Sequence, residues 1–251
     1  MKTLRRYDSA TGFTLVELLV VIGIMGLLLA LSAPIWSSLT GSSSITKSSS
    51  DIQGILEQAR SYSLANNTYT YVGIWEVDVM KAQQGGSNLP QGIGRVALGV
   101  VASPSGLKPF SSGATLSTNT ISSANAVPLS KLAFFDNLHI TGDLANSFSG
   151  GLNRKPSDLV ITSNTPTTLG FQWPLTATTP QYPNSFVKVI EFSPQGCARF
   201  QTNTAYVSSL QNYLELELVP SRGNSIALSD AKNSAIIQIN GITGAVRVYR
   251  P

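Results

Sequence analysis

Glu17 is the single charged residue inside an apolar run that extends from Phe13 to Ala33. These 21 residues would form a helix about 31 Å long at about 1.5 Å per residue, which is long enough to cross a bilayer. A charge at the centre of such a segment costs roughly 2.5–3.5 kcal/mol on insertion scales. An unpaired carboxylate in this position therefore requires a partner or a function.

The basic residues that precede the run predict its orientation in the membrane. Lys2, Arg5 and Arg6 immediately precede it, and a cluster of basic residues favours the cytoplasmic side of a membrane. We therefore expect the chain to cross the inner membrane once, with a periplasmic C-terminal domain.

Two simpler interpretations compete with a specialised role for Glu17. As a first-turn residue, it could favour the dipole of its own helix and extend towards the lipid headgroups. Alternatively, the run could be an ordinary secretory signal that is cleaved near residues 30–33. Against the second interpretation, the apolar run is long, Glu17 interrupts it, and Pro34 would follow the best small residue, Ala33.

The basic leader, the pair Gly12-Phe13, Glu17 four residues later and the long apolar run together resemble the signal of the type IV pilin/pseudopilin superfamily, with its prepilin-type N-terminal cleavage/methylation motif. The resemblance implies that a prepilin peptidase removes residues 1–12 by cleaving after Gly12, and that Phe13 becomes N-methylated. It also implies that Glu17 acts in filament assembly. There, its carboxylate would neutralise the terminal amine of a neighbouring subunit, which lies at the positive end of a helix dipole.

Gly23, Gly26 and Pro34 weaken the N-terminal helix, and Pro34 also removes a backbone donor. Membrane helices commonly tolerate such residues. The pilin resemblance favours a second interpretation, in which they soften the helix so that it can partly unwind when it leaves lipid for a filament core.

After Pro34 the segment 37–44 contains poor helix formers, and an apolar stripe with helical spacing then resumes at Ile52, Ile55, Leu56 and Ala59. The helix therefore either continues to about Asn66 or breaks near Gly41 and restarts. We expect one long helix over residues 13–66, with residues 13–33 in the membrane and the second half packed on a globular domain.

The pattern of residues 67–251 changes to a period of two. Residues 70–79 and 213–219 alternate apolar side chains with carboxylates: Glu76 and Asp78 in the first segment, Glu215 and Glu217 in the second. Further strand candidates are residues 95–102, 131–135, 158–162, 186–192, 197–200, 235–239 and 245–249. We predict an α+β fold, with a long N-terminal helix and a mainly antiparallel β-sheet domain. Segments near 83–130 and 162–184 read as loop insertions or small extra hairpins.

Three short motifs narrow the resemblance. Residues 51–65, with Ala59-Arg60-Ser61 at their centre, look like the helix of GspH/FimT-type minor pseudopilins. Residues 190–196 resemble that family's turn before a glycine, and residues 243–248 resemble its final strand. The ending, residues 242–251, and residues 127–129 also resemble the Verru_Chthon cassette protein D family. The middle loops are longer than a compact member of the first family carries.

Composition argues against an enzyme. Charged residues make up 12% of the chain, well below the usual share of about 25%. The net charge is +4, but three basic and one acidic residue precede Phe13, so the processed chain carries +2 and the basic balance is weak evidence for nucleic acid. A single histidine, His139, with no partner evident in the sequence, and a single cysteine, Cys197, exclude metal sites built on His and Cys clusters. We expect no cofactor and no enzymatic activity.

Two residue groups have weaker alternative interpretations. Cys197 reads as a small packing residue in a strand, and the alternative is a reactive thiol or an intermolecular bridge. A loop calcium site could use oxygen ligands from Asp136, Asn137 and Asp143, although no EF-hand spacing is present.

Three functions remain in competition. The first is a minor pseudopilin, a structural subunit of a type II secretion-like pseudopilus. The second is a minor pilin of a type IV pilus or DNA-uptake filament, in which the resemblance would assign DNA contact to the basic C-terminal residues Arg247 and Arg250. The third is a membrane-anchored carbohydrate-binding module that uses Trp75, Trp173 and Tyr182. The expected partners are a prepilin peptidase, other pseudopilins or pilins, an inner membrane assembly platform and inner membrane lipid. We do not expect nucleic acid as a partner.

Overall fold

A computed structural model describes residues 14–80, 92–108, 120–142, 144, 154–162, 170–175, 182–186, 188–200, 211–226 and 233–250. Within these ranges, the side chains of residues 30–44, 120 and 182–185 are outside the description. The chain divides into two compact units, residues 1–42 and 43–251.

One helix, α1, runs without interruption from Leu15 to Ala65. Of the two expected alternatives, the continuous helix is therefore confirmed and the break near Gly41 is wrong. The helix ends because Asn67 adopts a left-handed conformation (φ 49°), and the Thr68 N–H then donates to the Ser63 carbonyl at 3.0 Å. This arrangement is a Schellman motif, with Asn in the position that Gly usually takes.

The sequence predicts a membrane span over residues 13–33. The part of the chain described by the structure contains no helical stretch with the length and apolar character needed to cross a bilayer. Phe13 and the side chains of residues 30–33 lie outside that part.

The globular unit is built on one mainly antiparallel sheet, which confirms the α+β class. Its principal strands lie in the order β10-β9-β1-β2-β5-β11-β13-β14, while the short strands β4, β6 and β12 pair with β2, β11 and β11 respectively. The strand bounds are β1 Thr70–Asp78, β2 Gly94–Ala102, β4 Val127–Pro128, β5 Ala133–Thr141, β6 Leu159–Ile161, β9 Lys188–Phe192, β10 Ala198–Phe200, β11 Tyr213–Arg222, β12 Ser225–Ile226, β13 Ala235–Asn240 and β14 Val246–Tyr249.

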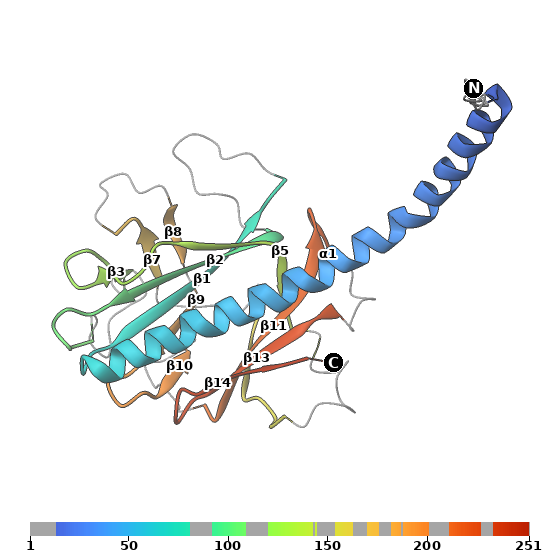
Figure 1. Ribbon diagram of the computed structural model, residues 1–251. Coiled ribbons are helices and arrows are strands. Elements are labelled where there is room, and N and C mark those ends of the chain that lie inside the picture. The colour runs from blue at the N-terminus through green and yellow to red at the C-terminus, as the bar shows by residue number, and fades with distance from the viewer. Residues whose placement is uncertain are drawn as a thin grey trace, which may run out of the picture. The chain divides into compact units, whose positions relative to one another are not determined.

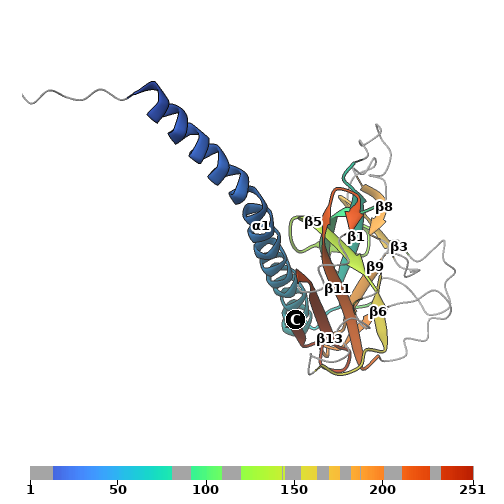
Figure 2. The same ribbon diagram turned by 90° about the vertical axis from the view of Figure 1, so that its right-hand side faces the viewer.

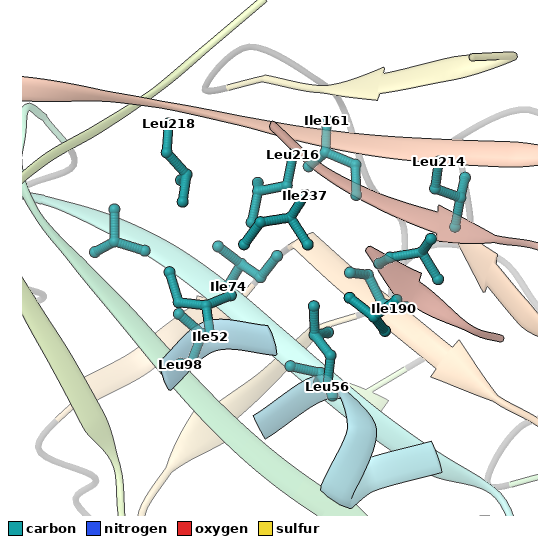
Figure 3. Packing of buried hydrophobic residues seen from close by; sticks show 14 of the residues in the cluster. Ile52, Leu56, Ile74, Leu98, Ile161, Ile190, Leu214, Leu216, Leu218 and Ile237 are labelled. Carbon is teal, nitrogen blue, oxygen red and sulfur yellow. The ribbon is translucent and has the colours of Figure 1, made fainter. Parts of the chain in front are cut away.

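The second half of α1 packs on one face of this sheet, as Figure 1 shows. The predicted apolar stripe supplies the contact, because Ile52, Leu56 and Ala59 are all fully buried. In Figure 3, Ile52 and Leu56 lie among side chains from five strands of the sheet: Ile74, Leu98, Ile190, Leu216 and Ile237. This shared core explains why the globular unit begins inside the helix, at Ser43, and not after the helix ends.

A second, three-stranded sheet covers part of the opposite face of the main sheet (Figure 2). It has the order β3-β7-β8, with β3 Thr120–Ile121, β7 Gly170–Trp173 and β8 Tyr182–Phe186. Strands β7 and β8 form a small hairpin inside the segment predicted as an insertion near 162–184. Phe171 and Phe186 stack with ring centroids 5.0 Å apart. Gly73 makes room for them, because a Cβ there would lie 2.4 Å from the Phe171 ring.

The carboxylates that alternate along β1 and β11 are buried. Alternation located the strands correctly, but all nine residues of β1 are buried, including Glu76 and Asp78. In β11, Glu215 and Glu217 have no exposed surface. Neither pair of carboxylates therefore faces solvent. The physical reason is that other segments cover both faces and bring partners for the carboxylates.

Candidate functional site

The described part of the processing motif begins with a helix cap. The Thr14 hydroxyl accepts a hydrogen bond from the Glu17 N–H at 3.2 Å and lies 3.5 Å from the Glu17 carboxylate, to which it donates. This threonine and glutamate, three residues apart, have the spacing of a capping box. Glu17 is exposed and lies in the first turn of α1, near helix N–H groups that have no intrahelical acceptor. Gly12 and Phe13 lie outside the described residues.

The turns that follow expose a large apolar surface. Between Leu15 and Leu29, twelve large apolar side chains are exposed, with exposed fractions from 41% at Val21 to 82% at Leu15. We call residues 15–29 the apolar segment. A contiguous exposed surface of this kind marks an interaction with protein or lipid.

The predicted softening residues lie within the unbroken helix. Apart from the adjacent backbone of the helix itself, no described atom lies within 4 Å of the position that a Cβ would take on Gly23 or Gly26. The backbone remains helical through position 34, where Pro34 cannot donate. Softening of the helix stays a prediction.

The three motifs from the finer resemblance meet in space. The Arg60 Nε–H donates to the Thr243 carbonyl at 2.7 Å. A Cβ on Gly244 would lie 2.1 Å from the Gly196 carbonyl oxygen, and a Cβ on Gly196 would lie 3.0 Å from Leu64. We call this contact between α1, the β9–β10 turn and the β13–β14 turn the motif junction. Its left-handed glycines are Gly196 (φ 81°) and Gly244 (φ 66°).

Strands β13 and β14, which correspond to the strand candidates 235–239 and 245–249, form an antiparallel hairpin. The loop runs to Ala245, whose carbonyl accepts from the Asn240 N–H at 2.9 Å. Gly241 is required for space, because a Cβ there would lie 1.7 Å from the Gln211 carbonyl oxygen.

The two arginines considered for DNA contact have different environments. The Arg250 guanidinium donates to the Ser49 hydroxyl at 2.8 Å and also binds the Thr46 hydroxyl, so it attaches the end of the chain to α1. Arg247 is exposed on β14. Contact with DNA through Arg250 would require it to give up these hydrogen bonds.

His139 has a partner that the sequence did not reveal. Its Nδ1 contacts the carboxylate of Glu76, which is 63 positions away and also accepts from the Ile140 N–H at 3.2 Å. Lys188, 2% exposed, lies near the same carboxylate. Burial lowers the pKa of Lys188, and the negative charge of Glu76 partly offsets that shift. These three residues form a buried cluster of titratable side chains on strands β1, β5 and β9.

Two further carboxylates hold segments of the chain against the sheet. Arg154 binds both oxygens of Glu215, at 2.5 and 2.7 Å, and the Gln238 side chain donates to the same carboxylate at 2.7 Å. Lys108 binds Glu191 at 2.7 Å. Alternation alone could not find these ion pairs, because each partner lies in a different segment.

The remaining candidates do not come together as a site. Cys197 is partly exposed in the turn before β10, and not in a strand as expected. Asp136 pairs with Arg95, Asn137 is left-handed (φ 57°), and Asp143 lies outside the described residues. Within the described ranges, no three His, Cys, Asp or Glu side chains are arranged to hold a metal ion.

The aromatic groove expected for carbohydrate is not formed by Trp75. Trp75 is 4% exposed, and its ring meets the Phe186 ring edge-on at 6.1 Å. Trp173 contacts the same ring at 6.4 Å. The Tyr182 side chain lies outside the described residues. Core packing therefore accounts for Trp75, while Trp173 is partly buried at the edge of the same cluster.

Comparison with known proteins identifies the N-terminal segment. Residues 8–33 match the model of the prokaryotic N-terminal methylation motif. Neither the curated proteins nor the solved structures include a match to this chain. The motif indicates a type IV pilin-like or pseudopilin protein. It implies processing by a prepilin peptidase and assembly with other pilins.

Proposed function

We propose that the processed chain is a minor pseudopilin, a structural subunit of a type II secretion-like pseudopilus. The observation that carries this proposal is the methylation motif at residues 8–33 on a helix whose apolar segment is exposed. Peptidase cleavage after Gly12 would produce a subunit that begins at N-methyl-Phe13. The globular unit would remain outside the membrane as a non-enzymatic domain.

The apolar segment requires cover in two settings. Before assembly we propose that residues 13–33 lie in the inner membrane, because the apolar run of the sequence continues beyond Leu29 to Ala33. After extraction by an assembly platform, the same side chains would pack against the helices of neighbouring subunits. Glu17 would then meet the terminal amine of a neighbour, which offsets the cost of placing its charge in an apolar environment.

The convergence of the three motifs supports a GspH/FimT-type subunit. Arg60, Gly196 and Gly244 come from the segments that carry that resemblance, and all three lie at the motif junction. The involvement of Arg250 in the fold favours a secretion-type filament over a DNA-uptake filament.

The test is co-purification with the major subunit of the same filament system. Glu17→Gln keeps the shape of the side chain and removes its charge. We expect this variant to be cleaved and methylated normally, as read by intact mass, but to be lost from the filament fraction.

Glu57→Gln is the matched control, because Glu57 is an exposed glutamate on the same helix and, among the described residues, its carboxylate bonds only to Gln53, at 3.2 Å. It should assemble at the wild-type level. Wild-type incorporation of Glu17→Gln would reject the assembly role. An intact mass that corresponds to a chain beginning near residue 33 would reject prepilin processing.

A further inference from the structure

A polar cavity opens where α1 ends, on the globular unit. Its volume is about 420 Å³, within the range of about 300–1,000 Å³ typical of small-molecule sites. The helix end and the segment after β2 line it, chiefly through Tyr62, Asn66, Asn67, Thr68, Ser103 and Ser105. The residues proposed to act in processing or assembly lie outside this cavity.

Hydrogen bonds fix the walls of the cavity. Thr68 donates through its hydroxyl to the Ser103 carbonyl at 2.5 Å, and the Ser103 N–H donates to the Tyr69 carbonyl at 2.9 Å. The Ser103 hydroxyl in turn donates to the Leu107 carbonyl at 2.6 Å. A ligand would therefore enter a preformed site and would not have to order these segments.

The groups that face the cavity are neutral and polar. None of its lining residues is charged. Lys108, which follows the lining segment, is directed to Glu191 at 2.7 Å and lies 5.1 Å from the centre of the Tyr69 ring. Asn66 uses its amide N–H to bind the Tyr62 carbonyl at 3.1 Å, which leaves its side-chain oxygen as an acceptor.

Asn67 offers both a donor and an acceptor. Its left-handed backbone presents an exposed side chain, and that amide makes no hydrogen bond to any residue in the described ranges. Tyr62, 36% exposed, adds an aromatic ring with a polar end.

We propose that this cavity binds a neutral saccharide. The amides of Asn66 and Asn67 would pair with adjacent hydroxyl groups, which can both donate and accept, while the Tyr62 ring covers the apolar face of the sugar. A charged ligand would find no countercharge among the lining residues. This site uses none of the three aromatic residues that the sequence suggested for carbohydrate.

The test is saturation-transfer NMR on the full chain in a zwitterionic detergent that lacks a sugar headgroup. The probes are cellohexaose, maltohexaose and tetra-N-acetylchitotetraose. We expect at least one to receive saturation from the protein. Asn67→Gly should weaken its binding about tenfold, because one hydrogen-bonding side chain is lost. Glycine accepts the left-handed backbone, so the helix end should be unchanged.

Asn137→Gly is the matched control, because Asn137 is also an exposed left-handed asparagine (φ 57°) but lies outside the cavity. It should bind the probe like the wild type. A far-ultraviolet circular dichroism spectrum equal to the wild type should confirm that Asn67→Gly is folded. Saturation of none of the probes, or equal binding by wild type and Asn67→Gly, overturns the proposal.

Discussion

The carbonyl oxygen of Gly196 lies 2.1 Å from the position that a Cβ would occupy on Gly244, so these two turns contact through their main chains. Both glycines also have positive φ values, which other residues adopt only with strain. Glycine at position 244 is therefore required for two independent reasons, conformation and space, and glycine at position 196 chiefly for its conformation.

Gly244→Ala tests this dependence. The added methyl group must displace the Gly196 carbonyl or the Arg60 side chain, so we expect the free energy of unfolding to fall by about 2–5 kcal/mol. Urea-dependent pulse proteolysis of the full chain measures the change. Gly54→Ala is the control, because Gly54 is an exposed helical position whose Cβ site has no described atom within 4 Å apart from the adjacent helix backbone. It should stabilise the helix by up to about 1 kcal/mol. Equal effects of the two substitutions would contradict the close contact.

Arg154→Met tests the buried ion pair with Glu215. The Arg154 side chain is 11% exposed and Glu215 is fully buried, so the substitution leaves a carboxylate whose one remaining hydrogen-bond partner among the described residues is Gln238. We expect a loss of about 3–5 kcal/mol in the free energy of unfolding. Arg95→Met breaks an ion pair whose two side chains are 40% and 59% exposed, and it should cost about 1 kcal/mol or less. A loss of that smaller size for Arg154→Met would show that water reaches Glu215.

Lys188 predicts a pH dependence of stability. Its pKa in the folded chain is lowered from 10.5, mainly by burial. Between that lowered pKa and 10.5 the unfolded chain binds more protons than the folded chain, so the free energy of unfolding rises with pH across this window. Below the window the ammonium is charged in both states, and the full cost of burying it remains.

Lys188→Met should remove this rise. Unfolding of both proteins is measured from neutral pH to 10.5, and the wild type should gain stability relative to the variant as pH increases. Lys131→Met, at an exposed position, should leave the slope unchanged. Parallel curves for wild type and Lys188→Met would mean that the buried lysine keeps its ordinary proton affinity.

Substitution of Thr14 distinguishes the helix-capping role of Glu17 from its proposed role in filament assembly. Thr14→Val removes the hydroxyl that accepts from the Glu17 N–H, and loss of a cap costs about 0.5–2 kcal/mol. Hydrogen exchange at the first turn of α1 should become faster, while Thr14→Ser should behave like the wild type. Filament incorporation should survive Thr14→Val, because the Glu17 carboxylate is still present. Exclusion of Thr14→Val from filaments would mean that assembly depends on the helix cap. The proposed pairing of the Glu17 carboxylate with a neighbouring subunit would then be rejected.

The sequence predicted the helix and the main strands well, because the spacing of apolar residues along a short segment determines which element it forms. Period-two alternation located β1 and β11, and the apolar stripe through Ile52 and Leu56 identified the buried face of α1. It could not reveal that Glu76 and Glu215 are buried, because their partners His139 and Arg154 are 63 and 61 positions away.

Tertiary contacts also determine the structure of the turns and of the helix in ways that the sequence pattern did not predict. The sequence indicated strands on either side of Gly196 and of Gly244, but the contact between these two turns depends on how both hairpins pack against α1. The segment 37–44 reads as a poor helix former, yet the backbone there is helical. Propensity is a weak signal beside the context of the whole chain.

The bond from Arg60 to Thr243 joins positions 183 apart, and those from Arg250 to α1 join positions more than 200 apart. The first element of the globular unit is thus completed by the last. Contacts between such distant positions form late, since a long loop must close before they can stabilise the chain. The side of the helix that carries Ser49 and Arg60 must therefore wait for the C-terminal segment, and a chain interrupted before that segment would lack both contacts.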